Sequence, residues 1–124
     1  MLERDTTKQN GLIDKHLKGS RFLFERRPDY KNGRAAKRYY DGNIHVKNSQ
    51  LNYPIEIKID NKELSESESL KAQYFLDNGI KEIIARYYVV KKEWQTYYYS
   101  GKTIGIDNNL AKALEQLIDN ETNN

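Results

Sequence analysis

An acidic residue two positions before a lysine is the spacing in this chain that could do chemistry. Three such pairs occur, in Asp29-Tyr30-Lys31, Glu56-Ile57-Lys58 and Asp60-Asn61-Lys62. A chain so rich in charge gives about that many pairs by chance, so the spacing alone indicates nothing. Only Glu56-Ile57-Lys58 falls within a predicted strand, where residues two apart point to the same side. This segment is therefore the candidate site.

Two predicted strands position the candidate segment. The first runs from Lys37 to Val46 and the second from Tyr53 to Asp60. Apolar and polar residues alternate along both strands, which gives each strand one apolar face and one polar face. The polar, turn-forming segment 47–52 lies between them, so the two strands are predicted to form an antiparallel hairpin.

Within this hairpin we expect Asp41 to lie opposite Lys58 and Asn43 to lie opposite Glu56. Asp41, Glu56 and Lys58 then converge on the polar face, whereas a register change of one residue would separate them. Two carboxylates on an apolar support repel each other unless a cation lies between them, and Mg²⁺ takes one or two carboxylates together with water. Asp41 and Glu56 are therefore predicted to bind Mg²⁺, or Mn²⁺.

The remaining pattern predicts a single α+β domain over residues 1–120, with a frayed tail at 121–124. The element order is α-β-β-β-α-β-β-α, with a central mixed sheet that contains the antiparallel hairpin. Besides the hairpin, the predicted elements are a short helix that ends before Gly19, a strand at Arg21–Glu25, a helix from Ser65 to Asp77 that opens with a Ser65/Glu68 capping box, strands at Lys81–Val90 and Gln95–Ser100, and a last helix capped by Asp107.

Composition excludes several classes of protein. The chain has 124 residues and no cysteine, so one domain is expected, without disulfides or thiolate metal ligands. The first ten residues are polar, and no apolar run reaches the roughly 18 residues of a membrane span. We therefore expect a cytoplasmic protein that does not enter a membrane.

Basic residues are concentrated between Arg21 and Arg38, where seven basic residues face only Glu25 and Asp29. Such a patch suits a partner that carries a line of phosphates, and a merely soluble surface is the alternative interpretation. The residues expected to hold the DNA backbone are Arg26, Arg27, Arg34, Lys37 and Arg38.

Several of these features together resemble a known family. They are Asp41 at a strand, Glu56-Ile57-Lys58, Leu64-Ser65 before a helix that ends at Asn78-Gly79, and the strand residues Ile83-Ile84-Ala85. This order resembles the PD-(D/E)xK, or restriction-endonuclease-like, superfamily, particularly its small phage and Holliday-junction-resolvase-like branches. The resemblance covers roughly residues 21–90.

The resemblance implies a metal-dependent endonuclease that hydrolyses DNA phosphodiester bonds and is selective for DNA structure in some branches. Asp41 and Glu56 would be the metal ligands and Lys58 the catalytic lysine. Gln73 or Lys71 on the following helix would play a supporting polar role. The chain departs from the signature at Tyr40, which replaces a proline, and Asp14 and Glu3 are the candidates for an acid on the first helix.

Plainer interpretations remain for each of these residues. Glu56 and Lys58 would also suit the solvated face of a strand, and Asp41-Gly42 is typical of a turn or bulge. His16 is expected to be a satisfied packing histidine, and His45 a surface or packing histidine.

Other functions also stay open beside the nuclease, which we expect to act as a homodimer. The first is a nucleic-acid-binding protein without catalysis. The second is a small inhibitor from a phage or mobile element that binds a host nucleoprotein as its protein partner, with the acidic last helix mimicking nucleic acid.

Overall fold

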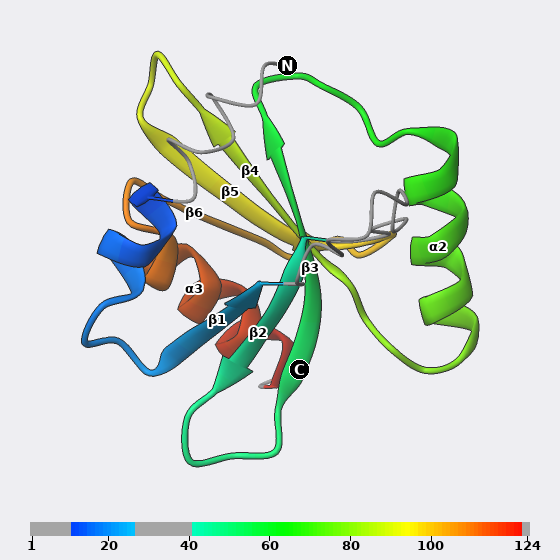
Figure 1. Ribbon diagram of the computed structural model, residues 1–124, viewed down its shortest axis with the longest axis horizontal. Coiled ribbons are helices and arrows are strands. Elements are labelled where there is room, and N and C mark those ends of the chain that lie inside the picture. Colours follow the sequence, from blue (N-terminus) through cyan, green and yellow to red (C-terminus); the bar gives the residue numbers. More distant parts are fainter. Residues whose placement is uncertain (1–10, 27–40, 123–124) are drawn as a thin grey trace, which may run out of the picture.

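The chain forms a six-stranded mixed sheet with helices on both faces, as seen in a computed structural model that describes residues 11–26 and 41–122 (Figure 1). This arrangement confirms the predicted α+β class. The described elements are a helix at residues 11–17, β1 (Phe22–Arg26), β2 (Gly42–Val46), β3 (Asn52–Ile59), α2 (Glu66–Asp77), β4 (Ile83–Tyr88), β5 (Glu93–Tyr98), β6 (Ile104–Asp107) and α3 (Leu110–Thr122).

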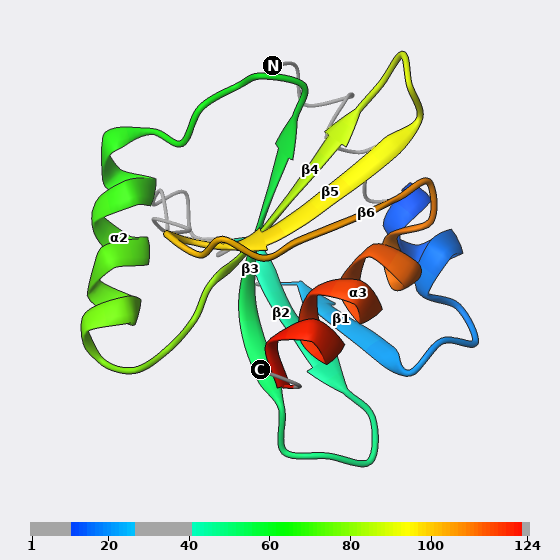
Figure 2. The same cartoon turned by 180° about the vertical axis from the view of Figure 1, so that it is seen from behind.

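The strands lie in the order β1-β2-β3-β4-β5-β6, and all neighbours are antiparallel except β3 and β4. The parallel pair requires a crossover, which α2 provides. Figures 1 and 2 show α2 on one side of the sheet, and α3 and helix 11–17 on the other. The two central strands β3 and β4 are therefore covered on both faces.

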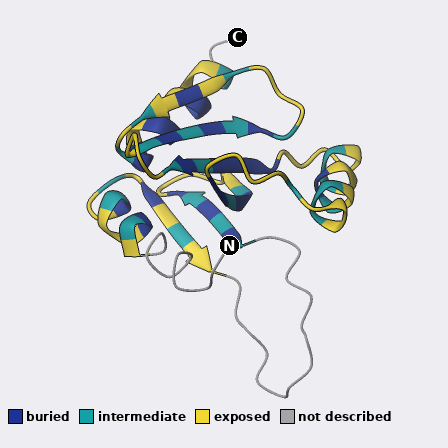
Figure 3. Ribbon diagram, turned by 90° about the horizontal axis from the view of Figure 1, so that it is seen from above, coloured by how far each residue is buried: buried dark blue, intermediate teal, exposed yellow. Residues whose placement is uncertain are grey.

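The hydrophobic core lies between the sheet and the pair formed by α3 and helix 11–17. Strand residues such as Phe22, Ile55 and Trp94 pack there, together with the predicted stripe of Leu110, Leu114, Leu117 and Ile118 from α3. Figure 3 shows this burial along the strands, while the outer faces of the helices are exposed. α2 contributes much less, because Ala72 is its one buried residue.

Besides ends of the predicted strands β4 and β5 that differ by two residues, three details of the predicted elements are wrong. β6 was not predicted, because its alternation is only four residues long and contains Gly105. α3 begins after Asn109 rather than at Asp107, since Asn109 Oδ1 accepts the Lys112 amide at 3.2 Å while Asp107 accepts the Asn109 amide. Finally, α3 continues to Thr122, so the first two residues of the predicted frayed tail are helical.

The register of the predicted hairpin is also wrong, by two residues. Asn43 lies opposite Pro54, not Glu56, and the Asp41 amide donates to Ile55 O at 3.0 Å, so Asp41 lies beside Glu56 rather than opposite Lys58. The cause is the position of the hairpin loop, which spans residues 47–50. A shift of two residues preserves the side of the sheet, so the expected side chains still share one face.

The helix at 11–17 ends as predicted, with Gly19 at a φ of 76°. His16 packs as expected, and its Nδ1 accepts the backbone N–H of Leu110 at 3.1 Å, at the start of α3. Across residues 11–26 and 41–122, no helix has the length and apolar character needed to cross a membrane.

Candidate functional site

Asp41 ties the start of β2 to the middle of β3. Its Oδ2 accepts the backbone N–H of Ile57 at 2.6 Å, in addition to the ladder bond from its own amide to Ile55 O. The next residue must be a glycine, because a Cβ at position 42 would lie 2.3 Å from the carbonyl oxygen of Glu25 on β1. Close packing of β1 on β2 thus fixes the backbone that carries Asp41.

Glu56 and Lys58 lie on the face of β3 that α2 covers. They are only 4% and 7% exposed. A solvated strand face would leave such side chains in water, so that plainer interpretation of Glu56 and Lys58 is wrong. Burying charge is costly unless it is paired, which makes their partners decisive.

Lys58 pairs with Glu68 on the first turn of α2. Its Nζ lies 2.6 Å from Glu68 Oε1. The same oxygen accepts the Ser65 amide at 2.8 Å, while Ser65 Oγ accepts the Glu68 amide at 3.1 Å, which confirms the predicted capping box. One carboxylate therefore both caps the helix and binds the buried lysine of the sheet.

Lys71, which follows Glu68 on α2, pairs with two buried carboxylates. Its Nζ lies 3.2 Å from Glu56 Oε1 and 2.9 Å from Glu82 Oε2. Glu82 immediately precedes β4, is 1% exposed, and its Oε1 has no hydrogen-bond partner among the described residues. Lys71 thus links α2 to both central strands.

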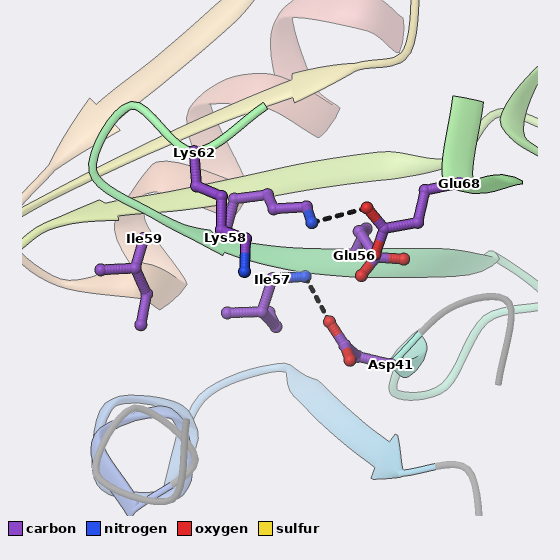
Figure 4. Close-up of a pocket in the computed structure, with 7 residues that line it drawn as sticks. All are labelled: Asp41, Glu56, Ile57, Lys58, Ile59, Lys62 and Glu68. Atoms are coloured by element: carbon purple, nitrogen blue, oxygen red, sulfur yellow. Dashed lines mark hydrogen bonds and ion pairs between the residues drawn. The ribbon is translucent and has the colours of Figure 1, made fainter. Parts of the chain in front are cut away.

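Several of these charged groups line a pocket of about 170 Å³ beside β3. Its lining consists of Asp41, Glu56, Ile57, Lys58, Ile59, Lys62 and Glu68. In Figure 4, Glu56 lies between Asp41 and Glu68, and Lys62 extends from the loop after β3 toward the pocket. The three residues predicted to do chemistry, Asp41, Glu56 and Lys58, therefore do share one pocket.

The carboxyl groups in this pocket have unusual pKa values. Burial and, after it, the neighbouring charge of Asp41 raise the pKa of Glu56 to about 9, and Lys71 opposes only part of this rise. Burial would also raise the pKa of Glu68, but hydrogen bonds from Lys58 and the Ser65 amide outweigh it and lower this pKa to about 2. Glu56 is thus the carboxyl group whose ionised form is disfavoured by the crowding.

The pKa of Glu82 is raised in the same way, because burial raises it and Lys71 counteracts only part of the effect. We refer to Asp41, Glu56, Lys58, Glu68, Lys71 and Glu82 as the charged cluster. Its four carboxyl groups face two ammonium groups, which leaves two negative charges in excess when all are ionised. Either protons or a cation must compensate them.

The donors of this cluster are carboxylate oxygens, which suit a hard cation such as Mg²⁺. Among residues 11–26 and 41–122, no group of three or more His, Cys, Asp or Glu side chains is arranged to hold a metal. Mg²⁺ does not need such a cage, because it usually keeps several waters and takes one or two carboxylates plus substrate phosphate. Asp41 and Glu56, which lie just before β2 and in the neighbouring strand β3 and line the same pocket, fit that pattern.

Other expected site residues lie elsewhere. Gln73 is exposed on α2 and donates to Asp77 Oδ1 at 2.8 Å, so Lys71 takes the supporting position. Arg26 pairs with Asp14 of helix 11–17 at 3.0 Å, which also takes the candidate first-helix acid away from the pocket. Outside the described residues lie Arg27, Arg34, Lys37, Arg38 and Glu3.

Sequence reasoning missed two members of the charged cluster. Glu68 was assigned only to the capping box, and Glu82 received no role. The sequence did contain a signal for Glu82. A carboxylate directly before the apolar run Ile83-Ile84-Ala85 is expected to be buried at the start of a central strand.

No family model, no curated protein and no solved structure matches this chain.

Proposed function

We propose that this protein is a metal-dependent nuclease that hydrolyses DNA phosphodiester bonds. The observation that carries the proposal is the excess of two negative charges in the charged cluster, at a pocket where Asp41 and Glu56 lie side by side. A divalent cation would offset the excess that these carboxyl groups have when all are ionised, and it would favour the ionised form of Glu56, whose pKa burial and Asp41 raise to about 9.

The arrangement of the elements also supports the proposal. Asp41 precedes β2, Glu56-Ile57-Lys58 lies in β3, and α2 crosses over to the parallel strand β4. This is the element order on which the resemblance to the PD-(D/E)xK superfamily rests, and the two acids and the lysine occupy neighbouring strands on one face.

Each side chain has a defined task in this reaction. Asp41 and Glu56 would hold Mg²⁺, which when bound supplies Lewis acidity toward a phosphate oxygen and toward water. Lys58 would donate a hydrogen bond to charge that develops on the phosphate. Glu68 orients the Lys58 ammonium at 2.6 Å, and Lys71 holds Glu56 from the other side at 3.2 Å.

The attachment of the basic segment 27–40 favours DNA as the substrate. Arg26 pairs with Gly42 across β1 and β2, so both ends of this segment leave the sheet next to Asp41. The segment contributes five basic residues against one acid, Asp29, to a chain with a net charge of +3; they are Arg27, Lys31, Arg34, Lys37 and Arg38. Basic side chains tethered there would contact backbone phosphates near the pocket.

The test is cleavage of plasmid, single-stranded and branched DNA with Mg²⁺ or Mn²⁺. Asp41→Asn, Glu56→Gln and Lys58→Met are each expected to lower the rate by at least about 100-fold. Gln73→Ala is the matched control on α2 and should cleave normally, since its side chain bonds only Asp77 among the described residues. Activity that survives both Glu56→Ala and Lys58→Ala would reject the proposal.

One observation favours a second candidate, nucleic-acid binding without catalysis. Both lysines of the charged cluster are already paired with carboxylates, which would also serve to dock α2 on the sheet. This candidate predicts DNA binding that depends steeply on salt and not at all on divalent metal.

A further inference from the structure

The loop that follows β3 carries a lysine that the charged cluster does not use. Lys62 lines the same pocket as Asp41 and Glu56, and Figure 4 shows its side chain directed over β3. It is exposed, and its ammonium group has no hydrogen bond or ion pair with any residue that the structure describes. Lys58 and Lys71, by contrast, are both engaged by carboxylates.

The backbone beneath Lys62 is held in place by Arg86 of β4. The guanidinium Nη1 donates to Asp60 O at 2.7 Å and to Lys62 O at 2.6 Å, and Nη2 donates to Tyr97 Oη at 3.3 Å. A planar guanidinium that binds two carbonyls fixes their relative position. Lys62 therefore projects from a defined point rather than from a loose loop.

Asp60 secures the other side of the same turn. It adopts a φ of 52°, its amide donates to Tyr87 O at 2.9 Å, and its Oδ1 accepts the Val89 amide at 3.0 Å. The Lys62 amide closes the turn on Ile59 O at 3.2 Å. The turn needs none of the Lys62 side chain for its own stability.

We propose that Lys62 binds a phosphate of the DNA backbone at the mouth of the pocket, next to the bond that is cut. This inference rests on the proposed nuclease function and names the residue that holds the substrate there. The excess negative charge of the cluster repels a phosphate, and a cation at the rim offsets that repulsion along the path of the substrate. An unpaired ammonium on a fixed turn provides it, since lysine binds phosphate as a point charge with three donors.

The test is binding of a fluorescein-labelled DNA duplex, measured by fluorescence anisotropy with Ca²⁺ in place of Mg²⁺ over a series of salt concentrations. Lys62→Ala should weaken binding about fivefold to tenfold and lower the slope of log K against log salt by about one. Lys62→Arg should retain most of the affinity.

Two results would overturn the inference while leaving the nuclease proposal intact. One is wild-type affinity and salt slope in Lys62→Ala, in a protein that binds divalent metal and cleaves DNA. The other combines two observations: the wild type binds millimolar inorganic phosphate and Lys62→Ala does not, yet both bind DNA with equal affinity. Lys62 would then belong to a site for free anions. Absence of metal-dependent cleavage in the wild type would instead reject the nuclease proposal itself.

Discussion

The carboxylate of Asp41 accepts the backbone amide of Ile57 at 2.6 Å, at the centre of the Glu56-Ile57-Lys58 segment. This bond places the carboxylate of Asp41, the residue just before β2, directly against the residues of β3. Asp41 consequently has a structural task beside the proposed chemical one. The two can be separated, because an asparagine retains an oxygen acceptor but not the charge.

Asp41→Asn should change the free energy of unfolding by less than about 0.5 kcal/mol, because its amide oxygen can still accept the Ile57 amide. Asp41→Ala leaves that amide without its acceptor and should cost about 1 to 2 kcal/mol. Urea denaturation in EDTA measures both. Equal stability of the two variants would show that the bond contributes little.

Lys71→Met should destabilise the protein by about 3 kcal/mol, because it leaves Glu56 and Glu82 buried without their shared cation. The double variant Lys71→Met/Glu82→Gln should lose less, since one of the two uncompensated charges is gone. Urea denaturation of the single and double variants gives the coupling. Additive losses would contradict the described bridge.

Amide hydrogen exchange should be faster in α2 than in α3. α2 buries only Ala72 and is attached to the sheet largely through Lys58–Glu68 and Lys71, whereas α3 buries an apolar stripe. Local opening of α2 therefore exposes little apolar surface. Exchange monitored by NMR or mass spectrometry would contradict this account if the two helices were equally protected.

His16 makes stability depend on pH. Burial lowers its pKa below the ordinary value, and Lys15 adds to this while Asp107 opposes it. The unfolded chain then binds the proton more readily, so the stabilisation from neutral His16 is complete above about pH 6.5 and is lost as the pH falls below it. His16→Ala should cost about 1 kcal/mol at pH 8, where it removes the acceptor of the Leu110 amide, and much less in acid.

Thermal unfolding between pH 5 and pH 8 checks this expectation. His45→Ala is the matched control, since His45 lies on β2 away from the start of α3. Its unfolding temperature should vary with pH as that of the wild type does, and so differ from that of His16→Ala. A penalty for His16→Ala that stays constant with pH would contradict the role given to the imidazole.

The fold could be predicted largely from local patterns. The alternation along β3 and the Ser65/Glu68 capping box predicted elements that the structure contains. Strand β6 was missed because Gly105 interrupts a short alternation, although a glycine is required there: a Cβ would lie 2.0 Å from Ala113 O of α3. That requirement comes from α3 packing on the strand, which no local pattern reveals.

The register of the β2–β3 hairpin shows why site geometry is harder to predict. Shortening the loop from the predicted residues 47–52 to 47–50 shifts the pairing of the two strands by two residues, and small contacts within the loop determine this choice. Asn48 adopts a φ of 61°, and Ser49 Oγ both donates to Val46 O at 2.8 Å and accepts the Leu51 amide at 3.0 Å. Polar residues in a loop allow several such arrangements, so the pattern of residues in the loop does not predict which one forms.

The role of the charged cluster was hidden for a different reason. Alternation in β3 predicts a polar face, and the polar face of a strand is usually exposed to solvent. Here α2 covers this face with Glu68 and Lys71. Only the parallel pairing of β3 with β4 requires a helix to cross there. The burial that gives the carboxyl groups their unusual pKa values is therefore a tertiary property.

Divalent-metal binding tests the central claim most directly. Titration of the wild type with Mn²⁺ at pH 7.5, followed by electron paramagnetic resonance of the free ion, should show one site per chain. Asp41→Asn and Glu56→Gln, both expected to fold, should each weaken it at least about tenfold. Wild-type protein that binds no Mn²⁺, or variants that bind it as tightly as the wild type, would contradict a metal site at Asp41 and Glu56.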